Sequence, residues 1–153
     1  MSILTDEVKH FFQRQGYVVV STFGRDENIH SSCKGIVSIS QEDEIYLLDL
    51  YSGETQKNLK KNKKISVVGI DEHKFVGYCL KGKAEIVDNE EVSPEIVNVW
   101  KNKIASRVTN RILKQIKGEK GHPKHPEILM PHPKYMIVMK VEEVVDLTPA
   151  HLK

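Results

Sequence analysis

The sequence lacks a long apolar run and a set of paired cysteines, and each absence excludes a class of protein. No apolar run among its 153 residues approaches the roughly 20 residues that cross a bilayer, so no membrane partner is expected. The two cysteines, Cys33 and Cys79, stand alone in separate strand-like runs and form neither a disulfide framework nor a CxxC pair. Residues 1–7 lack the basic-then-apolar order of a secretory signal. Together these absences favour a reducing, cytoplasmic location.

A strong charge of one sign is also missing. The net charge is only +2, which argues against a dedicated nucleic-acid-binding protein. Lysines do gather within residues 57–64 and again within 114–124, and each group is either a solvated face or an anion site. With 39% hydrophobic and 29% charged residues, the composition is that of a globular protein. The length favours a single domain over residues 1–153.

The residue pattern predicts a mainly β protein with helices between some strands. Thr5 can cap a first helix that Gly16 ends, and Ser93 can cap a long helix that runs to Gly118 with one apolar stripe headed by Trp100. Runs rich in β-branched and aromatic residues are joined by short polar turns, which requires antiparallel pairing of those strands. The predicted strands are 17–23, 29–40, 45–51, 65–70, 75–87 and 134–147, with a short helix at 54–61. Six such strands predict a closed antiparallel barrel with packed helices.

The junction between the strand that ends at Tyr51 and the short helix is the most informative local feature. A helix N-terminus presents free backbone N–H groups and a partial positive charge, which suit an anion. Thr55 adds a hydroxyl donor in the first turn, and Lys57 adds a positive charge within reach. A hydrogen bond to a charged group contributes roughly 1.5–3 kcal/mol, so several converging donors could hold a phosphate. The alternative is a helix that merely carries lysines on its wet face.

The strand at residues 29–35 supplies a second cluster of polar side chains. Alternate residues of a strand share a face, so Ser32 and Lys34 are expected to point together and away from Cys33. Small polar residues here suggest a surface against which something else packs. An ordinary exposed strand face is the alternative.

These segments, in this order, resemble a known family. The strand YVVVSTFG, the strand IHSSCKGIV, the segment EIYLLDLYSGETQKNLKKNKKISVVGID and the strand FVGYCLKGKAEIV are similar to small FMN-binding split barrels of the pyridoxamine 5'-phosphate oxidase-like superfamily. The resemblance runs from about Leu4 to Val87, and a closing strand near Tyr135 fits the same architecture. It implies a six-stranded antiparallel split β-barrel (Greek key) with packed α-helices. It also implies a homodimer with the flavin at the interface.

The same resemblance assigns residues to the FMN. The Thr55-x-Lys57 unit would bind the flavin phosphate, the strand around Cys33 would lie beside it, and the strand end at residues 49–51 would lie along the isoalloxazine ring. The cofactor-binding residues implied in this way are Ser32, Cys33, Lys34, Asp49, Leu50, Tyr51, Thr55, Gln56 and Lys57.

Two departures from the family pattern limit what is implied. Glu54 stands where a basic residue often precedes the Thr-x-Lys unit, which places an acid beside the expected phosphate. The arginine- and histidine-rich C-terminal signature of true pyridoxamine phosphate oxidases is absent, so the vitamin B6 reaction is not expected. The resemblance therefore implies an FMN-dependent oxidoreductase of unknown substrate, and no side chain stands out as its general acid or base.

Other cofactors and roles stay open at the level of sequence. A non-enzymatic flavin carrier or electron-transfer module is one alternative, because no nicotinamide motif such as GxGxxG is present. A related barrel that binds haem or a deazaflavin is another, and His122, His125 and His132 motivate the haem version. A metal site is not predicted from these histidines, because a structural zinc ion requires four fixed ligands and no cysteine lies nearby.

Overall fold

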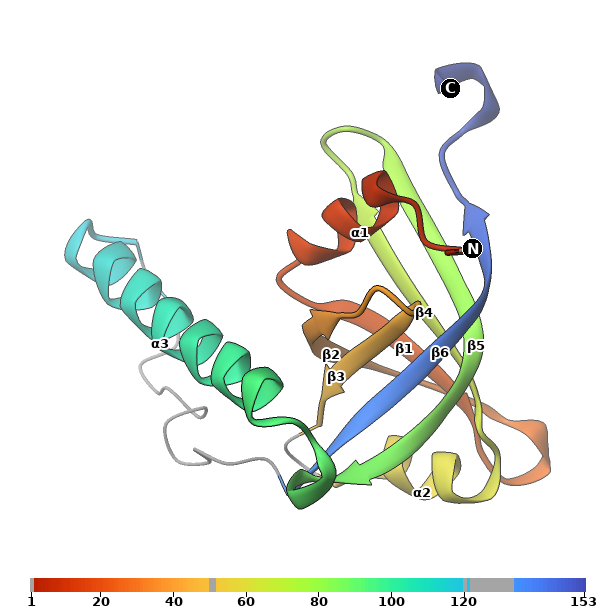
Figure 1. Ribbon diagram of the computed structural model, residues 1–153. Helices are drawn as coiled ribbons and strands as arrows, with labels where there is room; N and C mark the ends of the chain where they lie inside the picture. The colour runs from red at the N-terminus through yellow and green to blue at the C-terminus, as the bar shows by residue number, and fades with distance from the viewer. Residues whose placement is uncertain (1, 50–51, 120, 122–133) are drawn as a thin grey trace.

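A computed structural model of the chain describes residues 2–49, 52–119, 121 and 134–153. Six strands and three α-helices occur in this part of the chain (Figure 1). The strands are β1 Val18–Phe23, β2 Ile29–Ile39, β3 Glu44–Leu48, β4 Lys64–Asp71, β5 Val76–Asp88 and β6 Tyr135–Asp146. The helices are α1 Asp6–Gln13, α2 Glu54–Lys61 and α3 Pro94–Ile116, with single 3-10 turns at Arg25–Glu27, Asn89–Glu91 and Ala150–Leu152.

The strands form one closed antiparallel barrel in the order β1-β2-β3-β6-β5-β4, and β4 pairs with β1 to close it. β5 and β6 are the longest strands and pair along most of their length, with a shift of register between Lys81 and Gly82. A Cβ at Gly82 would lie 2.0 Å from the carbonyl oxygen of Lys140, so only glycine allows the two strands to approach so closely at this bulge. The closed six-stranded barrel predicted from the sequence is confirmed.

Two apolar clusters hold the structure together. The larger one fills the barrel with inward-facing residues of all six strands and includes α1, whose Phe11 ring meets the rings of Phe12 and Tyr78 edge to face at 5.1 Å in both pairs. The smaller one lies outside the barrel, where Trp100 of α3, 2% exposed, packs with Val37 of β2 and neighbouring residues of β3 and β6. Trp100 is therefore a core residue, as its position in the apolar stripe predicts.

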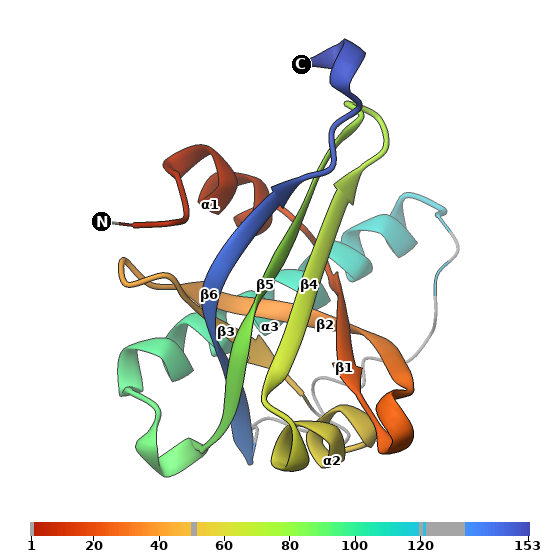
Figure 2. The ribbon, with the colours of Figure 1, turned by 90° about the vertical axis from the view of Figure 1, so that its right-hand side faces the viewer.

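The three helices occupy different parts of the barrel surface. α1 covers one end, α2 lies at the opposite end, and α3 lies against the outside of β2 and then extends away from the barrel (Figures 1 and 2). Only the first half of the apolar stripe of α3 is buried, since Ile112 and Ile116 are 44% and 76% exposed. No helix in the described part of the chain is both long enough and apolar enough to span a membrane.

The N-terminal segment is tied to the turn between β2 and β3. Asp43 of this turn is 4% exposed, and its carboxylate accepts hydrogen bonds from the Ser2 hydroxyl and the backbone N–H groups of Ile3 and Leu4 at 2.5–3.0 Å. Burial by itself would raise the pKa of Asp43. These hydrogen bonds and the charge of Lys140 together outweigh burial and lower that pKa to about 2.

Candidate cofactor site at the α2 end of the barrel

The N-terminus of α2 has no side-chain cap of the kind that begins the other two helices. The hydroxyls of Thr5 and Ser93 accept hydrogen bonds from backbone N–H groups in the first turns of α1 and α3. Gly53 occupies the equivalent position before α2 and has no side chain with which to do so. A Cβ added at Gly53 would meet no atom within 4 Å. The first N–H groups of α2 therefore have no side-chain acceptor at Gly53, and the open space beside this residue can receive an anion.

A pair of hydroxyls joins this helix to the second strand. The Thr55 and Ser32 oxygens lie 3.0 Å apart, and Thr55 is only 1% exposed. Two hydroxyls that share one hydrogen bond keep one hydrogen that can be donated to a third group. The pair is thus a donor as well as a structural link, and it brings together two residues that the sequence assigned to the same site.

The second turn of α2 is held in place by residues that the sequence analysis did not assign to the site. The Asn58 side-chain amide donates to the Thr22 hydroxyl of β1 at 3.1 Å, and both residues are buried with Leu59. Asn58 lies three residues after Thr55 and so shares its helix face, which is the only sequence signal that pointed to it. These contacts hold the first turn of α2 in position against β1 and β2.

Lys34 and Asp49 do come together, but as an ion pair. The Lys34 ammonium lies 2.8 Å from one oxygen of Asp49, and the Tyr135 hydroxyl donates to the other oxygen at 2.5 Å. The Asp49 side chain is fully buried and that of Lys34 is 12% exposed. Burial, and then the hydrogen bond to Asp49, raises the pKa of the Tyr135 phenol well above its ordinary value. Tyr135 is the main residue of this site that the sequence analysis did not assign.

The remaining predicted residues are placed differently. Lys57 is exposed and lies 3.4 Å from Glu54, a surface pair that typically contributes no more than about 1 kcal/mol, so its ammonium is free to turn towards an anion. Gln56 is half-buried in the same turn. Cys33 is exposed on the opposite face of β2 from Ser32 and pairs with Val19 of β1. Predicted residues Leu50 and Tyr51 lie outside the described residues, as do His122, His125 and His132.

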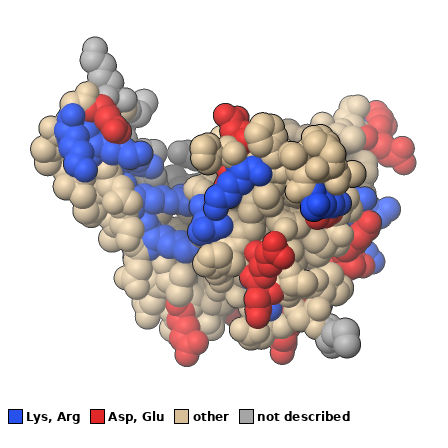
Figure 3. Space-filling model, turned by 90° about the horizontal axis from the view of Figure 1, so that it is seen from above, with Lys and Arg blue, Asp and Glu red and all other residues tan. Residues whose placement is uncertain are grey.

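Charge is distributed unevenly elsewhere on the molecule. Seen from the α1 end, lysine and arginine side chains form a band that runs from α3 across to the barrel (Figure 3). Two cationic side chains of α3 have a structural role, because Lys103 donates to the carbonyl of Ile36 at 2.8 Å and Arg107 to that of Gly16 at 2.7 Å. Burial, and then the neighbouring Arg107, lowers the pKa of Lys103. These two side chains therefore help to attach α3 to the barrel.

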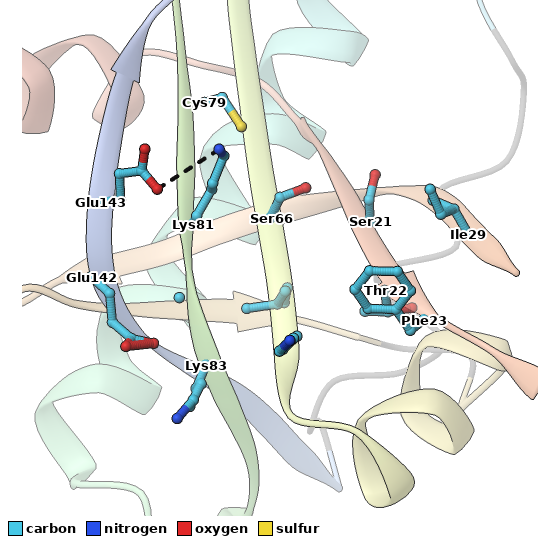
Figure 4. Close-up of a pocket in the computed structure, with 13 residues that line it drawn as sticks. Ser21, Thr22, Phe23, Ile29, Ser66, Cys79, Lys81, Lys83, Glu142 and Glu143 are labelled. Carbon is cyan, nitrogen blue, oxygen red and sulfur yellow. Dashed lines mark ion pairs between the residues drawn. The ribbon is translucent and has the colours of Figure 1, made fainter. Parts of the chain in front are cut away.

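A hollow of about 520 Å³ lies elsewhere, on the outside of the barrel (Figure 4). Its walls come from β1, β4, β5 and β6 and from Ile29 of β2, and it contains no residue that the sequence assigned to the cofactor site. The side chains that line it include Ser21, Phe23, Ile29, Lys64, Ser66, Cys79, Lys81, Lys83, Glu142 and Glu143. Among the described residues, no cluster of histidine, cysteine and acidic side chains suitable for a metal ion occurs here or elsewhere.

Comparison with known proteins places the chain in a family. Residues 4–146 match the family described as pyridoxamine 5'-phosphate oxidase. HupZ of Group A Streptococcus is 21% identical over 94% of this chain and 94% of its own, with a TM-score of 0.64. HutZ, described as a haem storage protein from Vibrio cholerae, is 17% identical over 94% of each chain, with a TM-score of 0.55. A protein described as an F420 reductase is 13% identical over 90% of this chain and 94% of its own, with a TM-score of 0.57. No curated protein matches the sequence.

The closed six-stranded antiparallel barrel, with helices at both ends, defines a protein of the split-barrel class. Within that class, the match over residues 4–146 shows that the chain belongs to the pyridoxamine 5'-phosphate oxidase family. The resemblance inferred from the sequence is confirmed. The solved structures share less than 25% identity with the chain, so they show a common fold and not a common ligand.

Proposed function

We propose that the protein is an FMN-dependent oxidoreductase that binds the flavin phosphate at the N-terminus of α2. The observation that carries the proposal is the start of α2, which has no side-chain cap and has open space beside Gly53, and whose Thr55 forms a hydroxyl pair with Ser32. This arrangement occurs in a family barrel, at the position that the sequence resemblance assigns to phosphate. We further propose that residues 1–153 form a single FMN-binding domain and that the flavin lies at the interface of a homodimer.

The residues present suit a phosphate better as hydrogen-bond donors than as a source of net positive charge. Asp49 already balances the charge of Lys34, and Glu54 lies close to Lys57. The backbone N–H groups at the start of α2 and the spare hydrogen of the hydroxyl pair are the donors that this proposal uses. In this proposal Thr55 and Ser32 orient the phosphate, Lys57 leaves Glu54 to contact it, and Gln56 lines the same turn. Lys34 is held in place by Asp49 and Tyr135.

Bound FMN would supply the electron-transfer chemistry, and the chain would supply binding and orientation. The fully buried Asp49 carboxylate is held by the Lys34 ammonium and the Tyr135 hydroxyl. No residue is assigned as an acid or base.

The first experiment is a visible spectrum of the purified protein, followed by titration with FMN and with riboflavin. A yellow protein, or uptake of added FMN with markedly weaker uptake of riboflavin, is expected because the proposed contacts are to the phosphate. A colourless protein that takes up neither flavin would overturn the proposal.

Two alternative functions can be tested with the same purified protein. A flavin carrier or electron-transfer module would contain FMN yet show no turnover with NADH or NADPH and a panel of acceptors. Haem or deazaflavin binding is suggested by the fold shared with HutZ and with the F420 reductase. Extraction of the cofactor and measurement of its mass distinguishes all of these from FMN, and a haem Soret band would point directly to the haem alternative.

A further inference from the structure

A second hollow, of about 480 Å³, lies on the outside of the barrel between β3, β5 and β6 and the start of α3. The chain leaves the end of β5, passes through the 3-10 turn Asn89–Glu91 and enters α3, so this segment forms one wall of the hollow (Figure 2). The volume falls within the roughly 300–1,000 Å³ of sites that hold small molecules. The hollow contains no residue that the sequence assigned to the flavin, and it shares only Lys83 with the 520 Å³ hollow of Figure 4.

The floor of this second hollow is apolar. Val138 of β6 lies directly opposite Tyr46 of β3 on the outward side of the barrel. Val87 of β5 and Val92, which is 6% exposed, extend the same floor towards α3. Tyr46, Val87 and Val92 also pack in the cluster around Trp100, so the core of the protein fixes their positions. Such a floor suits the apolar body of a ligand.

Charges of both signs surround this floor in equal number. They are the three lysines Lys63, Lys83 and Lys140 and the three glutamates Glu44, Glu85 and Glu91. Lys63 and Glu85 form an ion pair at 2.7 Å, and Glu44 lies directly opposite Lys140 on the neighbouring strand. Lys83 and Glu91 form no ion pair with any residue that the structure describes. One positive and one negative side chain of the hollow are thus left for a ligand.

Lys83 and Glu91 approach the hollow from two directions. Lys83 lies within β5, and Glu91 lies in the turn that follows the end of this strand at Asp88. The strand from Lys83 to Asp88 is roughly 17 Å long, at about 3.4 Å per residue. Both side chains reach into the hollow, so the distance between their charged groups is shorter than that. An extended peptide covers about 3.3–3.6 Å per residue, and two or three residues therefore span the remaining distance.

We propose that this hollow binds a zwitterionic peptide of two or three residues with apolar side chains and free termini. Its carboxylate contacts Lys83, its ammonium contacts Glu91, and its side chains lie on the floor formed by Tyr46 and the three valines. A ligand with only negative charge would meet three carboxylates here, and one with only positive charge would meet three ammonium groups. A zwitterion satisfies both signs at once. The proposal is independent of the FMN function, because the two sites share no residue.

The test is titration of the full-length protein with the dipeptide leucyl-leucine, followed by calorimetry and by the fluorescence of Trp100. Trp100 is the only tryptophan of the sequence and packs with three residues of the floor, so its emission reports on the hollow. Saturable binding of one dipeptide per chain is expected. The N-acetylated and the C-amidated dipeptides should each bind roughly five-fold more weakly, because each lacks one charged contact.

Two variants connect each end of the ligand to its own residue. Lys83→Gln should weaken binding of leucyl-leucine and leave binding of the C-amidated form unchanged, because that form has no carboxylate to lose a contact. Glu91→Gln should weaken binding of leucyl-leucine and leave binding of the N-acetylated form unchanged. Both residues are exposed, so both variants should fold. Lys101→Gln and Glu95→Gln make the same changes at exposed positions of α3 outside the hollow and should alter nothing.

Three results would overturn the proposal. They are the absence of saturable binding, equal affinity for free and doubly blocked dipeptides, and variants of Lys83 and Glu91 that behave like their controls. Flavin content is read from the visible spectrum of the same samples, so the two proposals can fail separately. A colourless protein that binds leucyl-leucine supports the peptide site and overturns the FMN function, and a yellow protein without peptide binding does the reverse.

Discussion

At the scale of single residues, the candidate site is built from hydroxyls and backbone donors whose neighbouring charges cancel. Lys34 is paired with Asp49, and Lys57 lies near Glu54. Recognition of a phosphate in this setting depends on directed hydrogen bonds, which are lost one at a time when a donor is removed. Three side chains of this site, Thr55, Glu54 and Tyr135, allow predictions at this scale.

Thr55→Val keeps the shape of the side chain and removes its hydroxyl. We expect FMN affinity to fall roughly five-fold, equivalent to about 1 kcal/mol, with riboflavin affinity unchanged, as measured by fluorescence titration. Thr109→Val makes the same change at an exposed position of α3 and should alter neither. Equal loss of FMN and riboflavin binding would show that Thr55 does not contact the phosphate.

Glu54→Gln removes the acid nearest the proposed phosphate. We expect FMN to bind several-fold more tightly, because a carboxylate repels a phosphate dianion, and the gain should shrink as salt is added, because Glu54 is exposed. Glu95→Gln, in the first turn of α3, is the matched control. Unchanged FMN affinity at low salt would mean that the phosphate binds elsewhere.

Tyr135→Phe removes a donor to the buried Asp49 carboxylate. We expect a loss of roughly 1.5–3 kcal/mol in the free energy of unfolding, measured by urea denaturation at neutral pH, whereas Tyr17→Phe, at 65% exposure, should cost almost nothing.

The same residue should govern stability in alkali. Because folding raises the pKa of Tyr135, its stabilising contribution is complete below its ordinary value near 10 and is lost as pH rises above that value. Tyr135→Phe should therefore show a shallower loss of stability above pH 10 than the wild type. A variant with the same alkaline profile as the wild type would contradict this assignment.

At the scale of secondary-structure elements, period-two and period-3.6 patterns sufficed to predict where the strands and helices lie. They also placed Ser32 and Lys34 on one face of β2 and Cys33 on the other. They could not predict that Asp49 accepts hydrogen bonds from both Lys34 and Tyr135, because Tyr135 is 86 residues away and meets Asp49 only after β6 joins β3. The alternation rule also gave no sign of which strands would be left uncovered.

The hydrogen bonds between the N-terminal segment and Asp43 of the β2–β3 turn predict how the stability of the protein changes at low pH. Folding lowers the pKa of Asp43 from 3.8 to about 2, so its contribution of about 2 kcal/mol is complete above pH 4 and is lost as pH falls towards 2. Asp43→Asn should be less stable than wild type at neutral pH by about that amount, and the difference should vanish near pH 2. Asn tolerates the positive φ of 61° at this position, and urea titrations at several pH values measure the difference.

At the scale of the whole molecule, the barrel and its family could be predicted from the order of strands and turns along the chain. The rows of outward-facing residues that run across neighbouring strands could not be predicted, because they combine residues that are far apart in sequence, such as Cys33 of β2 and Val145 of β6. A pattern of outward apolar residues on β1 and β4 becomes informative only once the helices are known to lie elsewhere.

The open start of α2 has one more consequence, for the thermodynamics of cofactor loading. A helix without a side-chain cap frays at its first turn, so an anion bound there would order the backbone as well as neutralise it. Loading and local folding would then be linked, and each would report on the other. Amide hydrogen exchange should accordingly slow at residues 54–57 when FMN is added, while exchange in the first turns of α1 and α3, already capped by Thr5 and Ser93, stays the same.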